Sequence, residues 1–351
     1  MKQRFRSALA SVTALALGIL AAPPLKAQDY PAMNLRFAHY LPATFAGSVV
    51  DKWFADEVQR RSNGKIKIQI FWAESMGKST ELLDLVAKGA VDMSATSQGY
   101  FPSQLPLVGM TNSVMMLFDS NEEALRINAE LMQRKAMQDE LRRNQVYPIF
   151  FHAVNTFRPF CSKKLDRLED FKGKKMRSWG EYVPLLWQSL GATPVTVLPA
   201  EFYESLQRGT VDCMFLPIDL TYNLKLYEVA KFTWDKGLGA IPTWPIWVNW
   251  KTYHEVWPPQ VRKLIEEVAR EAVERDVKTT RDAEATALKA MTSSHGVQVA
   301  RFNDMDRLEK TVPDLLATWV TKMEARGLGN EAREVAEFVR KRRAELRKSK
   351  P

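Results

Sequence analysis

The chain has 351 residues, a formal net charge of +9 and two cysteines. This length excludes a disulfide-stapled miniprotein and is sufficient for two domains with sizeable cores. Its 46% hydrophobic and 26% charged residues exclude an intrinsically disordered chain, whereas the basic excess raises the question of nucleic-acid binding.

The first 27 residues have the pattern of a secretory signal peptide. Residues 1–6 are basic, residues 7–25 are uncharged and rich in Ala and Leu, and the small residue Ala27 follows as a cleavage point. A membrane anchor is the alternative interpretation, but Ser, Thr, Gly and Pro residues dilute the apolar stretch. We therefore expect residues 1–27 to be removed on export.

Much of the positive charge lies at the two ends of the sequence. Removing residues 1–27 leaves 46 basic and 41 acidic residues, and residues 340–350 carry a further basic cluster that we expect to be a solvated helical tail. The remaining body is close to neutral, and a nucleic-acid surface needs basic residues gathered on one folded face. We therefore expect no nucleic-acid partner.

Strand and helix patterns alternate along the first half of the expected mature chain. In one strand, for example, Ile66, Ile68 and Ile70 alternate with polar residues. Helices between short apolar strands predict an α/β sheet covered on both faces. The expected strands are residues 35–40, 66–72, 91–96 and 146–151, and the expected helices are residues 49–61, 81–88 and 122–144.

The same pattern recurs in the second half and suggests a second α/β lobe. Residues 88–93 and 208–213 have the same pattern: an expected helix ends on a basic residue and Gly, and an expected strand then begins with Val-Asp. The alternative explanation is that this pattern is common in loops between helices and strands. The stretch 258–295 starts at two prolines and predicts a helix of about 55 Å. The other expected elements are strands 174–178, 193–197 and 211–216 and helices 182–190, 200–208, 305–325 and 331–347.

The sequence lacks the usual signatures of an enzyme. The four histidines are not at metal-ligand spacings, and there is no nucleophile elbow, phosphate loop or complete dinucleotide fingerprint. We therefore predict no catalytic residues, no cofactor and no metal. Cys161 and Cys213 can pair in an oxidising compartment, but the sequence alone leaves this open.

Two arginines in apolar surroundings are candidates for binding an anion. Arg158 and Arg177 each carry a planar guanidinium that can hold a carboxylate through two hydrogen bonds, although most arginines of a protein are simply surface residues. The tryptophans at positions 234, 244, 247 and 250 can line a cleft, but we favour core packing for most of them.

Several sequence blocks together carry a family likeness. The chain resembles the solute-binding proteins of tripartite ATP-independent periplasmic (TRAP) transporters over nearly all of its expected mature length. The most specific block is Phe171–Arg177, with the sequence FKGKKMR. The other blocks are Leu35–Pro42, Phe54–Val58, Gly64–Ile68, Gly89–Met93, Leu190–Val195 and Leu206–Asp212.

This resemblance implies a two-lobed α/β periplasmic binding protein fold, with a ligand cleft between the lobes and a long helix spanning both. It implies lobe I at residues 28–153 and 242–281, and lobe II at residues 154–241 and 282–351 with the C-terminal helices. It also implies a periplasmic monomer that captures an organic acid and delivers it to membrane permease subunits.

The resemblance assigns candidate ligand-binding residues. Arg177 matches the arginine that grips the ligand carboxylate in the family, and Arg158 matches one that assists it. By the same analogy, we expect the ligand to be contacted from the first lobe by His39, Tyr40, Ser97 and Gln98.

The sequence departs from the family pattern at two places near these arginines. The run Cys213–Pro217 replaces a polar run ending in Asn-Pro, and Trp179 stands close after Arg177 where relatives with sugar-acid ligands carry polar residues. The candidate ligand-contacting residues Trp179, Phe215 and Leu216 offer few hydrogen bonds to hydroxyl groups. We therefore expect a weakly hydroxylated, aromatic or aliphatic carboxylate as ligand. The alternatives are a secreted ligand sensor that uses the same closure and an enzyme on this scaffold.

Overall fold

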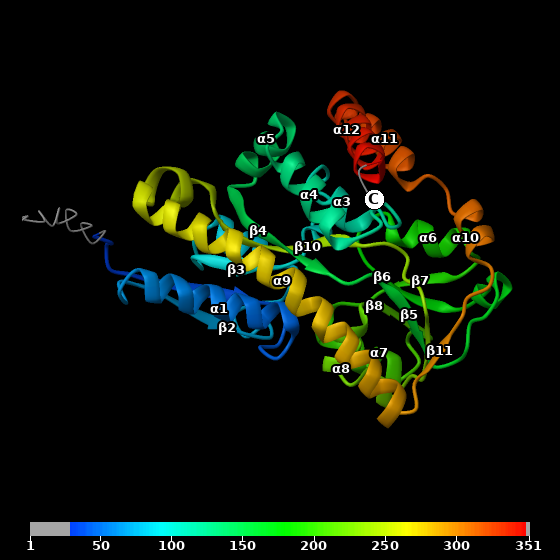
Figure 1. The fold of residues 1–351 in the computed structure, drawn as a ribbon. Coiled ribbons are helices and arrows are strands. Elements are labelled where there is room, and N and C mark those ends of the chain that lie inside the picture. Colours follow the sequence, from blue (N-terminus) through cyan, green and yellow to red (C-terminus); the bar gives the residue numbers. More distant parts are fainter. Residues whose placement is uncertain (1–28, 349–351) are drawn as a thin grey trace, which may run out of the picture.

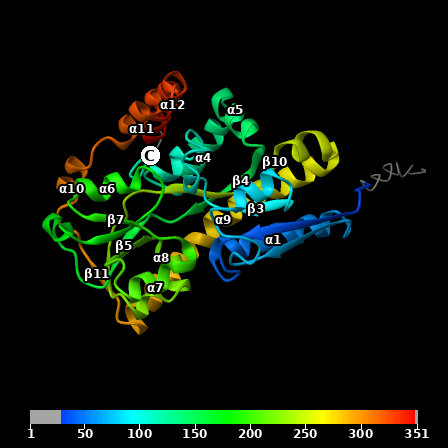
Figure 2. The same ribbon diagram turned by 180° about the vertical axis from the view of Figure 1, so that it is seen from behind.

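The computed structural model describes residues 29–348, so the expected signal peptide lies outside the described residues. Figures 1 and 2 show two α/β lobes, each built on one mixed sheet, and a long helix that runs along both of them. The two-lobed α/β architecture predicted from the sequence is confirmed.

The first lobe is built on a five-stranded sheet, and one of its inner strands comes from the second half of the chain. Strands β1, β2 and β3 are parallel, and β10 inserts antiparallel between β3 and β4. Helices α1 (Ala46–Arg61), α2 (Leu82–Ala87) and α4 (Asn121–Met132) pack against it. The sheet order is β2 (Ile66–Phe71), β1 (Met33–His39), β3 (Met93–Ala95), β10 (Ile241–Asn249) and β4 (Val146–Val154).

The sequence analysis did not identify β10. Pro242 and Pro245 lie within it, and proline cannot donate to a strand ladder, so the run does not read as a central strand. The structure accommodates both prolines by shifting the β10–β4 register between Pro242 and Pro245 and again before Trp247. The strand is almost wholly buried, and this burial explains its continuous apolar pattern.

The second lobe is built on a six-stranded sheet. Cys161 and Cys213 lie opposite each other on neighbouring strands and form a disulfide, which answers the question the sequence left open. Helices α6 (Val183–Ser189), α7 (Phe202–Gln207) and α8 (Ile218–Asn223) belong to this lobe. The sheet order is β11 (Gln298–Ala300), β9 (Phe232–Trp234), β5 (Arg158–Cys161), β8 (Cys213–Leu216), β6 (Lys175–Ser178) and β7 (Thr193–Thr196).

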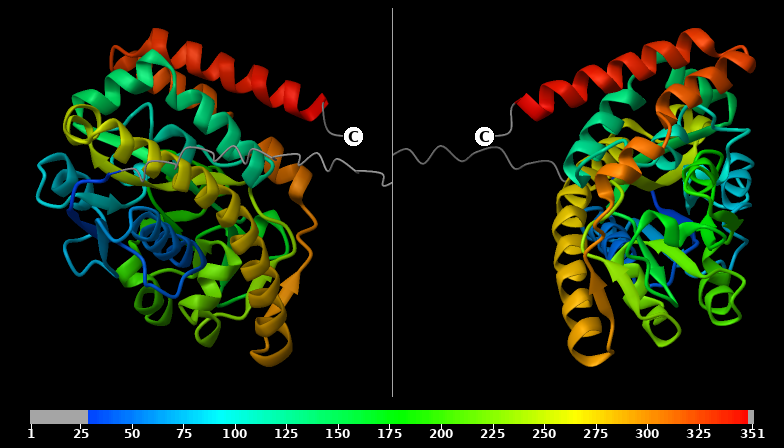
Figure 3. Two further views of the ribbon diagram at one scale, coloured as in Figure 1. Left: turned by 60° about the vertical axis from the view of Figure 1, so that its left-hand side comes forward. Right: turned by 90° about the vertical axis from the view of Figure 1, so that its right-hand side faces the viewer.

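The predicted long helix is present as α9 (Pro259–Ser294), which has 36 residues and is therefore about 54 Å long. It packs against α1 and β4 of the first lobe and against α8 of the second, so that it joins the backs of both lobes (Figure 3). Despite this length, α9 is amphipathic, and no helix within residues 29–348 has the combination of length and apolarity needed to cross a membrane.

Two predicted helices are each divided in the structure. The stretch 122–144 forms α4 and α5 (Lys135–Arg143), because Arg134 adopts an extended conformation between them. The stretch 305–325 forms α10 (Met305–Thr311) and α11 (Leu315–Ala325), where the carboxylate of Asp314 accepts the backbone N–H of Ala317 and caps the second helix.

The basic cluster expected as a solvated helical tail forms the end of the last helix, α12 (Gly329–Lys348), and most of its residues up to Lys348 are exposed, but ion pairs anchor it to the first lobe. Arg342 forms an ion pair with Glu130 of α4 at 2.6 Å, and Arg347 forms one with Asp119 at 2.9 Å. These contacts hold α12 against α4 beside the first sheet (Figure 3). The predicted division assigned residues 282–351 to lobe II; β11 does lie in the second sheet, whereas α12 packs on the first lobe.

Candidate functional site

A cavity lies between the two lobes. Most of the side chains around it are apolar, as is typical of small-molecule sites. The first lobe contributes Tyr40, Leu41, Ser97, Tyr100, Asn112, Val154, Ile241, Thr243 and Trp244, and the second lobe contributes Phe157, Arg177, Trp179, Pro199, Phe202, Leu216, Pro217 and Leu220.

Arg177 is the charged residue in the wall of this cavity. It lies on β6, is only 2% exposed, and donates from Nε to the carbonyl of Val197 and from Nη1 to the carbonyl of Phe215, both at 3.2 Å. Within residues 29–348 no Asp or Glu forms an ion pair with it, and its burial lowers its pKa. Because an arginine guanidinium remains charged in proteins, this site holds a buried cation without a protein counterion.

Aromatic rings hold the Arg177 guanidinium in place. Its central carbon lies 4.1 Å from the ring centre of Trp179 and 4.7 Å from that of Phe202, in cation–π geometry. The indole N–H of Trp187 also donates to the backbone carbonyl of Arg177 at 3.1 Å. The charged group is thus oriented before any ligand arrives, which reduces the entropic cost of binding.

Two tyrosine hydroxyls lie near the same guanidinium. Burial raises the pKa of Tyr40 and of Tyr100, and the positive charge of the nearby Arg177 offsets this only in part. Both hydroxyls therefore remain neutral at physiological pH and can donate a hydrogen bond to an anion next to Arg177.

Asn112 and Trp179 connect the two lobes across the cavity. The Oδ1 atom of Asn112 accepts from Trp179 Nε1 at 3.1 Å and from Ser97 Oγ at 2.9 Å. A Cβ atom on Gly99 would lie 2.1 Å from this Oδ1 atom, so only glycine fits there. The hydrogen bond from Trp179 joins side chains of opposite lobes and can form only when the lobes are closed.

Five of the nine predicted ligand-binding residues line this cavity: Tyr40, Ser97, Arg177, Trp179 and Leu216. The other four lie outside its wall and already have partners or packing. Arg158 donates from Nη2 to Glu284 Oε1 at 2.5 Å, Gln98 donates to the carbonyl of Pro242 at 3.1 Å, and Phe215 packs its ring against Trp179.

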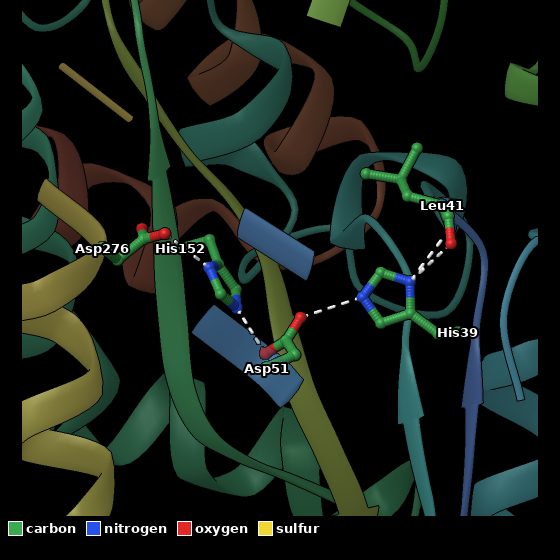
Figure 4. Close-up of polar contacts among 5 residues, drawn as sticks. All are labelled: His39, Leu41, Asp51, His152 and Asp276. Carbon is green, nitrogen blue, oxygen red and sulfur yellow. Dashed lines mark hydrogen bonds and ion pairs between the residues drawn. The ribbon is translucent and has the colours of Figure 1, made fainter. Parts of the chain in front are cut away.

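The fourth, His39, belongs to a buried chain of polar side chains (Figure 4). His39 Nε2 lies 2.9 Å from Asp51 Oδ2, and His152 lies between Asp51 at 2.8 Å and Asp276 at 3.0 Å. Burial alone would lower the pKa of His152, but the two carboxylates outweigh it and raise the pKa to about 10. The chain links β1, α1, β4 and α9, and it lies behind the cavity wall.

The sequence analysis missed several residues of the cavity wall. Asn112 lies in the four-residue helix α3 (Met110–Ser113), and Tyr100 and Thr243 lie in segments without a motif. Trp244 belonged to the tryptophan cluster, for which core packing was favoured; it is buried and lines the cavity as well. A fold is needed to bring these positions together.

No group of three or more His, Cys, Asp or Glu side chains within the described part of the chain has a geometry suited to hold a metal ion. The chemistry that the cavity offers is one fixed cation, a few hydroxyl groups and an apolar enclosure. This combination can bind a small carboxylate whose body is mainly apolar.

Comparisons with known proteins agree with this description. Residues 37–313 match the family described as bacterial extracellular solute-binding protein, family 7. A solute-binding protein of Roseobacter denitrificans is 28% identical over 64% of this chain and 67% of its own length, and the 2,3-diketo-L-gulonate-binding periplasmic protein of Escherichia coli is 23% identical over 90% and 94%.

The fold has close counterparts among solved structures. A TRAP solute-binding protein of Rhodoferax ferrireducens in complex with copurified benzoate has a TM-score of 0.80 and 22% identity, covering 90% of this chain and 98% of its own. One from Desulfovibrio salexigens with bound orotic acid has a TM-score of 0.78 and 20% identity, covering 89% and 99%. The chain belongs to the bacterial extracellular solute-binding protein family 7, and its fold is that of TRAP transporter solute-binding proteins.

Proposed function

We propose that this protein captures a weakly hydroxylated, aromatic or aliphatic carboxylate in the cavity between its lobes. The observation that carries the proposal is the buried Arg177 guanidinium, which has no carboxylate partner among residues 29–348 and lies in a mainly apolar enclosure. A buried cation is stabilised when an anion enters beside it.

The bound carboxylate would accept charge-assisted hydrogen bonds from those N–H groups of Arg177 that do not donate to Val197 and Phe215. The hydroxyls of Tyr40 and Tyr100 add further donors. A ligand with many hydroxyl groups would leave several of them unpaired against the apolar walls, at a cost of about 1–3 kcal/mol for each. The walls thus favour an apolar ligand body.

Closure of the lobes encloses the ligand. The hydrogen bond between Trp179 and Asn112 and the one from Asn223 Nδ2 to the carbonyl of Thr44, at 3.0 Å, both connect opposite lobes. A ligand that contacts both walls favours the closed arrangement in the same way, which is hinge-type closure. The closed form would then be the one that the membrane permease recognises.

Family membership supports the cellular role in this proposal. The protein would be exported by the signal-peptide pattern of residues 1–27, act as a monomer in the periplasm and deliver its ligand to TRAP permease subunits without catalysing a reaction. Structural relatives were solved with benzoate, orotic acid and pyroglutamate, which are carboxylates with compact ring bodies, and others with the sugar acids galacturonate and glucuronate. The apolar walls of this cavity favour the first group. A sensor role would be favoured instead if the neighbouring genes lacked permease subunits.

A thermal-shift screen of the purified protein with aromatic and aliphatic carboxylates tests the proposal. A ligand at about 100 times its Kd should stabilise the protein by about 2.7 kcal/mol. Arg177→Ala should abolish this stabilisation, and Arg177→Lys should weaken it because lysine lacks the planar fork. Arg281→Ala, which removes an exposed arginine paired with Glu122, is the control. Full stabilisation of Arg177→Ala, or no stabilisation of the wild type by any acid, would refute the proposal.

A further inference from the structure

The cavity offers its ligand a single positive charge. Arg177 is the lining residue with a charged side chain, and the remaining polar side-chain groups of the wall are hydroxyls, one amide and two indole N–H groups. Whether a second negative charge could be accommodated depends on the charged groups directly behind the two walls.

Behind the wall of the second lobe, Arg158 is already neutralised. It lies opposite Leu216 in the β5–β8 ladder, and its Nη2 atom is 2.5 Å from Glu284 Oε1 of α9. The two side chains are only 12% and 19% exposed, respectively, so solvent screens this ion pair little. The carboxylate of Glu284 therefore neutralises the positive charge of Arg158, and Arg158 does not act as a second cation for a ligand in the cavity.

A second acidic group reinforces this balance. Asp219 lies one residue before the lining residue Leu220 and is 4% exposed. Its burial, together with the nearby Glu284, raises its pKa to about 7. Glu284 thus lies near a second acidic side chain, and the cluster of Arg158, Glu284 and Asp219 presents no net positive charge to the ligand.

Behind the wall of the first lobe lies the buried chain shown in Figure 4. His152 stacks on the lining residue Trp244, with ring centres 4.5 Å apart, and His39 directly precedes the lining residue Tyr40. Both nitrogens of the His152 ring face carboxylates, of Asp51 and Asp276, so the ring donates through both and carries a positive charge.

His39 does not give this chain a net positive charge. Its Nδ1 atom lies 3.0 Å from the backbone nitrogen and 3.2 Å from the carbonyl oxygen of Leu41, and its Nε2 atom lies 2.9 Å from Asp51. Even with a positive charge on both rings, the carboxylates of Asp51 and Asp276 balance the two imidazoles. The chain therefore offers no unbalanced cation to an additional anion next to Tyr40 and Trp244.

We propose, building on the carboxylate-binding function above, that the cavity accepts singly charged acids and excludes dicarboxylates, and that Glu284 is a specificity determinant because it captures Arg158. A dicarboxylate would place its second carboxylate in the closed cavity without a cation. The cost of burying an unpaired charge predicts binding at least about 100-fold weaker than for a matched singly charged ligand.

Matched ligands separate charge from size. The acid that binds tightest in the screen is compared with two analogues that carry either a second carboxylate or an amide at the far end; for benzoate these are terephthalate and terephthalamate. Calorimetric titration at pH 8, where both carboxylates are ionised, should show the amide binding at least about 100-fold more tightly than the dicarboxylate. Equal affinities, an equal loss for both analogues, or tighter binding of the dicarboxylate would overturn the proposal. Failure of every acid would instead refute carboxylate binding itself.

A variant tests the role of Glu284. Glu284→Gln keeps the size of the side chain but removes its charge, and we expect it to reduce the preference for the amide over the dicarboxylate by about tenfold. Glu271→Gln removes an exposed carboxylate from the same helix, where it pairs with Arg61, and should leave this preference within about twofold. An unchanged preference in Glu284→Gln would show that Glu284 does not determine specificity. If this variant does not fold, the ligand comparison on the wild type still tests whether the cavity excludes dicarboxylates.

Discussion

Replacing His152 by leucine tests how strongly the buried chain of Figure 4 stabilises the first lobe. His152 lies between Asp51 at 2.8 Å and Asp276 at 3.0 Å, and the side chains of all three residues are fully buried. Leucine fills a similar volume but cannot donate, so the variant leaves both carboxylates without the imidazolium that neutralises them.

The expected loss is large. Removing one partner of a buried ion pair costs about 3–5 kcal/mol, because the remaining charge is left uncompensated. With an unfolding entropy of about 2.1 cal/mol/K per residue over the 320 described residues, each kcal/mol shifts the melting temperature by about 1.5 °C, so it should fall by roughly 4–8 °C. His295→Gln is the control, because the His295 ring packs on Tyr227 and has no carboxylate within ion-pair distance among the described residues; it should cost less than about 1 kcal/mol.

The pH dependence of this stabilisation follows from the raised pKa of His152. Because its folded-state pKa of about 10 exceeds the unfolded value near 6.5, its contribution is fully present below about pH 6.5 and is lost as the pH rises through about 10. Urea denaturation of the wild type and His152→Leu at pH 6.5, 8 and 9.5 should therefore give a stability difference that shrinks as the pH rises. A constant difference, or a loss below 1 kcal/mol at pH 6.5, would refute the proposed charge on His152.

Three further changes have defined outcomes. Trp179→Phe keeps an aromatic ring over Arg177 but removes the hydrogen bond to Asn112, and calorimetry should show ligand binding about tenfold weaker, while unchanged affinity would contradict a role in closure. Replacing Cys161 and Cys213 by alanine opens a disulfide spanning 52 residues and should destabilise the protein by about 2–4 kcal/mol in urea denaturation, with ligand affinity retained. Gly99→Ala would place its Cβ 2.1 Å from the closure contact, and small-angle scattering with saturating ligand should show a more open average shape than in the wild type.

Sequence reasoning predicted best those helices and strands that have a regular spacing of apolar residues or distinct start and stop signals. Helix α9 was predictable because it starts at prolines and contains no breaker until Gly296. Strand β10 was missed because Pro242 and Pro245 argue against a central strand. The neighbouring strands tolerate these prolines through register shifts, which no local pattern reveals.

In the candidate site, too, residues in a clear sequence motif were predictable and residues brought together by the fold were not. Arg177 was predictable because it lies in a specific motif, and its burial without a carboxylate partner agrees with the predicted role. Arg158 was assigned to the ligand by the same resemblance, but Glu284, 126 residues away in sequence, takes its guanidinium. Residues such as Tyr100 and Asn112 reach the cavity only through the packing of the lobes. Sequence reasoning therefore placed Arg177, Tyr40, Ser97, Trp179 and Leu216 at the site, but not the lining residues that only the packing of the lobes brings there.

A crystal structure of the protein with its tightest-binding acid tests the central claim most directly. The account predicts the ligand carboxylate in the cavity between the lobes, within about 2.7–2.9 Å of the Arg177 guanidinium nitrogens, with the lobes closed by the contact between Trp179 and Asn112. A carboxylate bound to Arg158, or an acid seated in the outer hollow between α4, β4 and α9 that Arg270 lines, would contradict it.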